Sequence, residues 1–209
     1  MNKAVTQELQ MLEVLGMSAM PLDGKKPTMK KWEQESTSVL FSKIKKGDNF
    51  GIRTGAASGC IVVDIDVKDR GLETWEKVSE KQEPIETYRV RTGSGGLHLY
   101  FAYEGTKGIK NGAKVVKVAG EKIGIDVKND AGQVVAALSI HPDTKKMYEA
   151  QVPIIEWSKR RTKEKKELFA KLPDWLRSLI VGDTELDADC NIIKVEKPAP
   201  KTEMSKSSW

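Results

Sequence analysis

Three short segments of the chain alternate apolar and polar side chains, and their polar positions carry carboxylates and an imidazole. The segments are residues 61–67 (IVVDIDV), 97–103 (LHLYFAY) and 123–127 (IGIDV). Because alternate side chains of a strand point to opposite sides of a sheet, each segment predicts a strand with one apolar face. If the three strands share one sheet over a common core, their polar side chains converge on the opposite, exposed surface. These side chains are Asp64, Asp66, His98 and Asp126.

Three carboxylates this close together raise one another's pKa unless a cation favours their ionised forms. Hard oxygen ligands suit Mg²⁺ or Mn²⁺, and Mg²⁺ leaves coordination positions for water and substrate phosphates. Two carboxylates at positions i and i+2 can each reach two ions about 3.5–4 Å apart, the arrangement that clamps attacking and leaving oxygens in nucleotidyl transfer. We therefore predict a two-metal site at Asp64, Asp66 and Asp126, and chemistry on phosphates.

A simpler interpretation of each motif exists. A DxD pair at a strand end is often a turn or capping feature, and a lone histidine is usually a plain surface or core residue. Their coincidence on matching faces of three strands favours function. Unpaired charge inside an otherwise apolar strand is also costly.

Two glycine-bearing segments predict contacts to an anion. In residues 89–98 (RVRTGSGGLH), the glycines let backbone amides approach a phosphate closely, although a tight hairpin turn is the alternative. In residues 51–55 (GIRTG), we expect a hairpin with the Asp64 strand across the turn at 55–59, which brings Arg53 and Thr54 to the same surface. The candidate nucleotide-binding residues of the first segment are Arg91, Ser94, Gly95 and Gly96.

Further candidates lie in three other segments. Ser139 and His141 follow Asp126 at a strand end, where ligand-binding side chains often gather, although His141 fits a turn equally well. Lys26 belongs to a basic and aromatic segment at 21–32 (PLDGKKPTMKKW), which contacts a triphosphate, stacks on a base or forms a solvated loop. The basic run at 158–166 (SKRRTKEKK) tracks a template backbone or is a solvated helix face.

The remaining periodicity predicts a mixed α/β (α+β) domain. Helical spacing appears at 4–16, 71–82 and 158–181, and further strand candidates at 87–91, 114–118 and 133–138. The polar, proline-bearing stretch from about 195 predicts a linker or a disordered tail. We expect a catalytic domain at 1–157, a C-terminal helical extension at 158–194 and a tail at 195–209.

Composition limits the location and the partners of the chain. No stretch approaches the roughly 18 apolar residues of a membrane helix, and the N-terminus lacks the apolar core of a signal peptide, so we expect a cytoplasmic protein with no membrane partner. Cys60 and Cys190 have no CxxC partner and support neither a disulfide framework nor a cysteine zinc site. The formal charge of +5 and a pI near 9.0 favour a polyanionic partner.

In order and spacing, these motifs resemble the bifunctional primase-polymerase domain of the archaeo-eukaryotic primase superfamily. That family has a DxD or DxE pair, a small-x-His motif and a later hydrophobic-Asp motif. Here they are matched by Asp64 with Asp66, by Gly96 to His98, and by Ile125 with Asp126. The resemblance covers residues 10–160, and the segment at 20–32 resembles the family's lysine-proline entry to the domain.

The resemblance implies an archaeo-eukaryotic primase fold, with an RRM-like catalytic sheet packed beside an N-terminal α/β module. It implies a template-directed DNA primase and polymerase of a plasmid, phage or mobile element, with a single-stranded DNA template, a primer and dNTPs or NTPs as substrates. A replicative helicase in cis or in trans is the implied partner. The implied ligands of two Mg²⁺ or Mn²⁺ ions are Asp64, Asp66 and Asp126. The implied contacts to the nucleotide phosphates are His98, Arg53, Ser94, Ser139 and His141.

The chain departs from the family at Ala136, Ala137 and Leu138, where relatives often carry prolines, and it has no zinc-binding insert. Three other classes of protein compete. A metal-dependent nuclease uses the same carboxylates but needs no nucleotide-cradling loops. A non-catalytic RRM-like module presents exposed aromatics for base stacking, whereas this face carries aspartates. A DxD glycosyltransferase accounts for the metal but not for His98 and Asp126.

Overall fold

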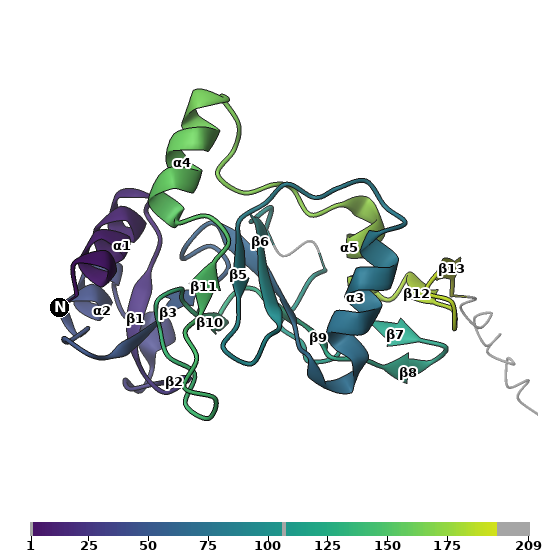
Figure 1. The fold of residues 1–209 in the computed structure, drawn as a ribbon, viewed down its shortest axis with the longest axis horizontal. Helices are drawn as coiled ribbons and strands as arrows, with labels where there is room; N and C mark the ends of the chain where they lie inside the picture. Colours follow the sequence, from purple (N-terminus) through teal and green to yellow (C-terminus); the bar gives the residue numbers. More distant parts are fainter. Residues whose placement is uncertain (1, 106–107, 196–209) are drawn as a thin grey trace, which may run out of the picture.

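The central layer of the fold is an antiparallel sheet with the strand order β11-β5-β6-β4-β9 (Figure 1). The computed structural model describes residues 2–105 and 108–195. The strands of the central sheet are β4 (Cys60–Ile65), β5 (Arg89–Arg91), β6 (Leu97–Ala102), β9 (Ile125–Lys128) and β11 (Glu149–Ala150). The predicted strands at 61–67, 97–103 and 123–127 therefore lie side by side, as the alternation indicated.

A second sheet, built mainly from the N-terminal part of the chain, lies beside the central one (Figure 1). Its antiparallel order is β10-β3-β1-β2, from β1 (Ala19–Asp23), β2 (Lys26–Pro27), β3 (Asn49–Arg53) and β10 (Gln133–Val135). The accompanying helices are α1 (Lys3–Val14), the 3-10 helix η1 (Trp32–Gln34) and α2 (Thr37–Ser42). We call this sheet the N-terminal sheet.

The other side of the central sheet carries helices and a small third sheet (Figure 1). The helices are the 3-10 helix η2 (Lys68–Arg70), α3 (Gly71–Ser79) and α5 (Asp174–Val181). The third sheet has the order β13-β12-β7-β8, from β7 (Lys117–Val118), β8 (Glu121–Lys122), β12 (Thr184–Leu186) and β13 (Ile192–Lys194). These helices and mainly antiparallel sheets confirm the predicted α+β class.

Each face of the central sheet is covered by its own apolar core. One core joins Val62, Val90 and Tyr100 to the N-terminal sheet and α1. The other joins the alternate residues, such as Val63 and Leu99, to α3 and α5. The predicted apolar face is therefore confirmed, but the opposite face is not wholly exposed, because the N-terminal sheet packs over much of it. The polar residues lie beside this packed region rather than on an open surface.

The expected hairpin between residues 51–55 and the Asp64 strand does not form. β3 pairs with β1 and β10, whereas β4 pairs with β6 and β9. Across the turn, the pairing is limited to the isolated bridge between Gly55 and Cys60. The glycine turn therefore carries the chain from one sheet to the other. Alternation identifies a strand, but it does not identify the strand's partner.

The C-terminal extension is not one helix over 158–181. Helix α4 (Ile154–Lys163) ends early, and α5 begins only after Pro173 and stops at Gly182, which adopts a left-handed φ of 76°. The intervening Phe169 enters the first core and Leu172 the second. The extension also contains β12 and β13, so it is not purely helical. The predicted tail at 195–209 lies, apart from Val195, outside the described residues.

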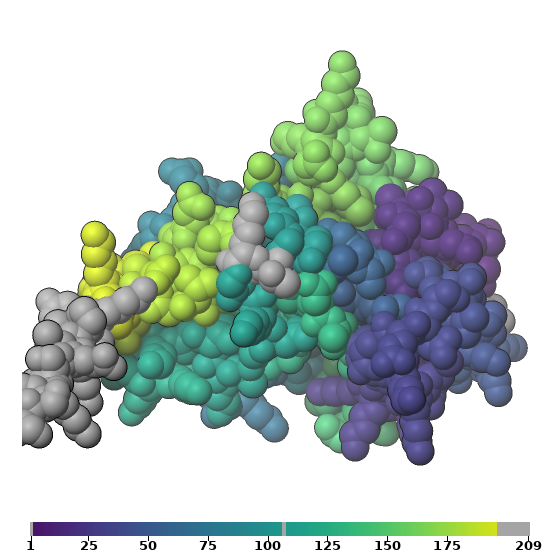
Figure 2. All heavy atoms as spheres, turned by 180° about the vertical axis from the view of Figure 1, so that it is seen from behind, coloured from purple at the N-terminus to yellow at the C-terminus, as the bar shows by residue number. Residues whose placement is uncertain are grey.

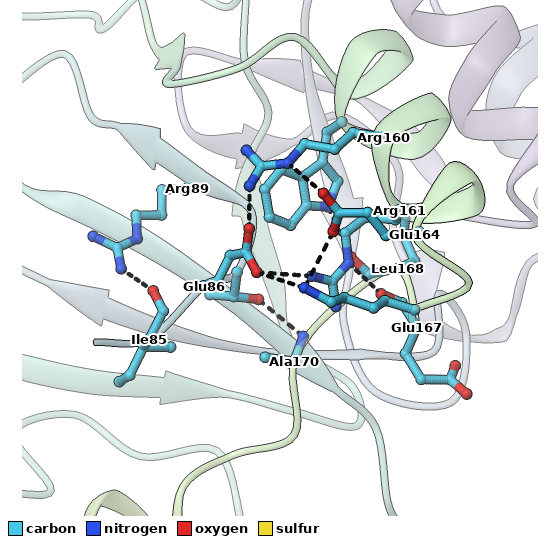
Figure 3. Close-up of polar contacts among 12 residues, drawn as sticks. Ile85, Glu86, Arg89, Arg160, Arg161, Glu164, Glu167, Leu168 and Ala170 are labelled. Carbon is cyan, nitrogen blue, oxygen red and sulfur yellow. Dashed lines mark hydrogen bonds and ion pairs between the residues drawn. The ribbon is translucent and has the colours of Figure 1, made fainter. Parts of the chain in front are cut away.

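Helix α4 projects from the body of the molecule, as Figures 1 and 2 show from opposite sides. Glu86 forms ion pairs with Arg160 and Arg161 in the C-terminal half of this helix (Figure 3). It also pairs with Lys166, just beyond the end of the helix. Much of the basic run at 158–166 is therefore engaged within the protein. Among the described residues, no helix is long and apolar enough to cross a membrane.

Glu8 gives the fold a testable pH dependence. Its side chain is buried in α1 beside the first core, and burial raises the pKa of its carboxyl from 4.5 to about 7. The folded state therefore keeps a proton that the unfolded chain has lost, so stability falls as the pH rises from 4.5 to 7. We expect Glu8→Gln to raise the free energy of unfolding by about 2–3 kcal/mol at pH 8.5, and much less at pH 5.

Urea denaturation at the two pH values measures this effect. Glu13→Gln, on the exposed side of the same helix, is the matched control and should change stability little at either pH. An equal gain for Glu8→Gln at pH 5 and pH 8.5 would contradict the assignment.

Candidate active site

The strand register brings three of the four predicted catalytic residues into direct apposition. Asp64 of β4 lies opposite His98 of β6 on one side and opposite Asp126 of β9 on the other. Directly opposed residues of antiparallel strands share one face and lie within reach of each other's side chains. The Asp64 carboxylate lies 3.5 Å from Nε2 of His98. Asp66 follows immediately after the end of β4.

The pKa of the fourth residue, Asp66, depends on the charges of the other two carboxylates. Burial raises the pKa of its carboxyl, and the charges of Asp64 and Asp126 raise it further. Lys25 and Lys128 oppose this effect. The three carboxylates are therefore close enough to repel one another, as the sequence predicted.

Asp126 has partners of its own. One of its carboxylate oxygens accepts a hydrogen bond from the backbone amide of Lys114 at 2.8 Å, and the other lies 3.1 Å from Nζ of Lys128. Lys128 stands two residues along the same strand, so the alternation that located Asp126 could also have located this lysine. The site therefore combines negative and positive side chains.

His98 is buried, and burial lowers the pKa of its imidazole, although the charge of Asp64 opposes this effect. Its Nδ1 is buried without a hydrogen-bond partner in the described part of the chain. At pH 7 the ring is therefore neutral, and it offers one donor and one acceptor.

Asp64, Asp66 and His98 open onto a pocket of about 380 Å³ between the central and N-terminal sheets, whereas Asp126 does not line it. One wall, from the central sheet and its loops, carries Asp64, Asp66 and His98. The second wall, from the N-terminal sheet and the segments next to it, carries Lys25, Trp32 and the segment 131–135. The remaining lining residues are Thr92, Ser94, Asn111, Lys128 and Tyr148. A concave site with converging polar groups is the usual form of a small-molecule site.

The glycine-rich segment lies at this pocket as a tight hairpin turn. The backbone amides of Thr92 and Gly95 donate to the carbonyl oxygens of Gly96 and Thr92, both at 2.9 Å, so these two amides are used within the turn. Ser94 lines the pocket, and its hydroxyl lies 3.0 Å from that of Thr92. Gly95 adopts a φ of 100°, and a side chain at Gly96 would overlap the carbonyl of Ile65. Thr92 and Ser94 therefore bring two hydroxyl groups to the pocket.

Arg91 and Lys26 do not line the pocket. Val90 pairs with His98, so Arg91 projects from the opposite face of the central sheet and lines a separate hollow with Glu149. Lys26 is exposed on β2, and its neighbour Lys25 lines the pocket instead. The sequence offered both lysines, and only the position of β2 distinguishes them.

The side chains of Thr54 and Ser139 form hydrogen bonds with backbone groups of other segments. The buried Thr54 hydroxyl donates to the carbonyl of Asn129 at 2.6 Å. The Ser139 hydroxyl donates to the carbonyl of Phe50 at 3.0 Å and accepts from its amide at 3.1 Å. Neither residue lines the pocket, and their predicted contact with a nucleotide stays a prediction.

His141 does not line the pocket, but it contacts Tyr148, a lining tyrosine that the sequence did not single out. Nδ1 of His141 accepts from the amides of Asp143 and Thr144 at 3.2 and 3.3 Å, which is the turn role left open above. Its ring stacks on that of Tyr148, with 6.1 Å between the ring centroids. The ring of Tyr148 also contacts that of His98, with 5.9 Å between the centroids. Burial raises the pKa of the Tyr148 hydroxyl to about 12, so it is protonated at neutral pH.

The carboxylate oxygens are hard ligands, which suit a hard divalent cation. The repulsion felt by Asp66 is what such an ion would relieve, and Mg²⁺ commonly takes one or two carboxylates. Within the described ranges, no group of three or more Asp, Glu, His or Cys side chains is arranged to hold a metal. Both carboxylate oxygens of Asp126 already have partners, one in the backbone amide of Lys114 and the other in the ammonium of Lys128.

Comparison with protein families gives one match. A family model described as "Bifunctional DNA primase/polymerase, N-terminal" matches residues 8–175, a range that contains every residue lining the pocket. No curated protein matches the chain.

Proposed function

The chain belongs to the family of bifunctional DNA primase/polymerase N-terminal domains, and we propose that it catalyses template-directed nucleotidyl transfer at the pocket beside Asp64. In this reaction the 3′-hydroxyl of a primer attacks the α-phosphate of a nucleoside triphosphate, a P–O bond forms, and pyrophosphate leaves. The substrates are a single-stranded DNA template, a primer, and dNTPs or NTPs.

One observation carries the proposal: Asp64, which is apposed to both His98 and Asp126, lines a pocket that also holds two lysines. A nuclease needs the carboxylates but not a pocket for a whole nucleotide. A non-catalytic nucleic-acid-binding module has no use for carboxylates that repel a phosphate backbone.

Asp64, Asp66 and Asp126 would hold Mg²⁺ or Mn²⁺, which when bound neutralises phosphate charge and makes the 3′-hydroxyl a better nucleophile. The lysines at 25 and 128 attract the triphosphate into the pocket. The hydroxyls of Thr92 and Ser94 hydrogen-bond its oxygens. His98, neutral at pH 7, contacts a phosphate through one ring nitrogen. Positioning and charge neutralisation then supply most of the rate enhancement.

The proposed setting is the replication of a plasmid, phage or mobile element. The motifs resemble those of replication proteins from such elements, and a polyanionic partner suits the charge of +5. A replicative helicase, in cis or in trans, is the corresponding protein partner.

Primer extension tests the proposal. A labelled primer on a single-stranded template is incubated with the protein, dNTPs or NTPs, and Mg²⁺ or Mn²⁺. We expect stepwise lengthening of the primer with a metal and none with a chelator, because the carboxylates otherwise repel the triphosphate. Metal-dependent shortening of the labelled strand without extension would replace this proposal by the nuclease.

A further inference from the structure

We propose that the base of the incoming nucleotide stacks on Trp32, and that Arg53 holds Trp32 in the position that this stacking requires. The proposal rests on the proposed function, since it assigns the base to one wall of the same pocket. It also gives Arg53 a role different from the phosphate contact that the sequence suggested.

Trp32 lines the pocket from the N-terminal part of the chain, whereas Asp64 and His98 come from the central sheet. It is the first residue of η1, it lines the pocket with Asp64 and His98, and it packs against the first core while staying partly exposed. The apolar packing supports one part of the indole and leaves the rest available to a ligand. A partly exposed aromatic ring beside a charged site suits a flat base attached to an anionic chain.

Trp32 is also the lining aromatic residue that is free to stack. Besides the imidazole of His98, the pocket is lined by two aromatic side chains, Trp32 and Tyr148. Tyr148 already contacts the rings of His98 and His141. In the described part of the chain, no aromatic ring stacks on Trp32.

Arg53 fastens the short helix that carries Trp32. Its Nη1 donates to the carbonyl of Glu35 at 2.8 Å and its Nη2 to the carbonyl of Glu33 at 2.7 Å. Helix η1 has three residues, no side-chain cap, and a preceding Lys31 with a φ of 54°. So short a helix has little stability of its own, and the two charge-assisted hydrogen bonds tie it to strand β3.

The same strand aligns the rest of this wall. Arg53 lies opposite Gln133 in the pairing of β3 with β10, and Nε2 of Gln133 donates to the carbonyl of Lys25 at 3.0 Å. Lys25, Trp32 and Gln133 all line the pocket. Arg53 does not line it, and its guanidinium is engaged with backbone carbonyls. Arg53 is therefore a positioning residue that acts through Trp32.

The test compares Trp32→Ala, Trp32→Phe and Arg53→Lys with the wild type. Steady-state primer extension gives KM for dATP at saturating primer–template, and KM for primer–template at saturating dATP. Inhibition by inorganic tripolyphosphate reports the phosphate contacts without a base. Binding of dATP with Mg²⁺ and no primer is followed by quenching of tryptophan fluorescence. Trp175→Phe, which changes a partly exposed tryptophan packed on Trp75 in the second core, is the matched control.

We expect Trp32→Ala to raise KM for dATP about tenfold, to leave the KM for primer–template and the tripolyphosphate inhibition unchanged, and to remove the quench. Phenylalanine should keep part of the stacking, and this milder variant also covers the case in which the alanine protein does not fold. Arg53→Lys keeps the charge but not the two-pronged geometry, and it should reproduce the rise in KM for dATP.

Three results would overturn the inference: an unchanged KM for dATP in both Trp32 variants, a rise confined to KM for primer–template, or a quench that persists in Trp32→Phe. Weaker inhibition of Arg53→Lys by tripolyphosphate would show instead that Arg53 contacts the phosphates of the nucleotide. If the wild type extends primers and the Trp32 variants behave like it, the inference fails and the proposed function stands. If the wild type binds dATP through Trp32 without extending a primer, the proposed function fails instead.

Discussion

Replacing Asp64 and Asp66 together by alanine is expected to abolish primer extension, with a loss of at least about a thousandfold, while leaving the protein folded. The double substitution removes the two carboxylates that line the pocket, and with them the groups that would hold the divalent cation. The fold should persist because the ties of Asp66 to Leu72 and Gly124 run through its backbone. The Asp64 side chain contacts His98, which the N-terminal sheet also helps to bury.

Stability provides a second measurement on the same variant. Burial and like charges raise the pKa of Asp66, so its ionised carboxylate destabilises the metal-free fold above its ordinary pKa range. We therefore expect the melting temperature of the double variant at pH 8 to equal or exceed that of the wild type. Added Mg²⁺ should stabilise the wild type and leave the double variant unchanged.

The matched control removes two carboxylates outside the pocket, as in Asp143→Ala with Asp189→Ala. Both residues are exposed, and neither lines the pocket. Its net charge equals that of the catalytic double variant, so it separates the loss of ligands from the loss of negative charge. Full extension by the Asp64/Asp66 variant would show that the catalytic carboxylates lie elsewhere.

Gly71→Ala is expected to destabilise the fold by about 3 kcal/mol or more, equivalent to about 6–12 °C in melting temperature. A methyl group at this first residue of α3 would overlap the carbonyl oxygens of Gly124 and Asp66 and lie 2.8 Å from the carbonyl carbon of Gly124. These are backbone atoms, which cannot rotate away as a side chain does. The clash would therefore push the end of β4 away from the start of β9. Asp66 directly follows β4, so its position would change as well.

Gly59→Ala is the matched control for this prediction. Gly59 has a φ of 63°, but no neighbouring atom lies within 4 Å of an added methyl group. It should cost about 1 kcal/mol, through backbone conformation alone. Equal destabilisation by the two substitutions, measured by thermal unfolding, would show that backbone overlap is not what requires glycine at position 71. A Gly71→Ala protein as stable as the wild type would likewise show that backbone overlap does not require glycine at position 71.

Several features of this protein follow from the sequence by itself. The period of two in residues 61–67, 97–103 and 123–127 determined which side chains share a face, and the structure pairs Asp64 with His98 and Asp126 as that period requires. The helical spacing at 4–16 and 71–82 likewise corresponds to α1 and α3. These are local properties, because side-chain direction repeats with the backbone geometry of one element.

Only the tertiary structure decided how the elements combine. The local pattern of residues 51–55 is that of a strand, but its pairing with β1 and β10 instead of β4 sends Arg53 to the η1 carbonyls. The register of β5 places Arg91 on the face away from His98, and the position of β2 selects Lys25 over Lys26 for the pocket. Strand pairing and the packing of one sheet on another depend on contacts between residues far apart in the chain. No local period encodes those contacts. The alternation therefore predicted the carboxylate face, and the segment at 21–32 was a candidate for base stacking, but only the packing of the sheets brings Trp32 to the same pocket.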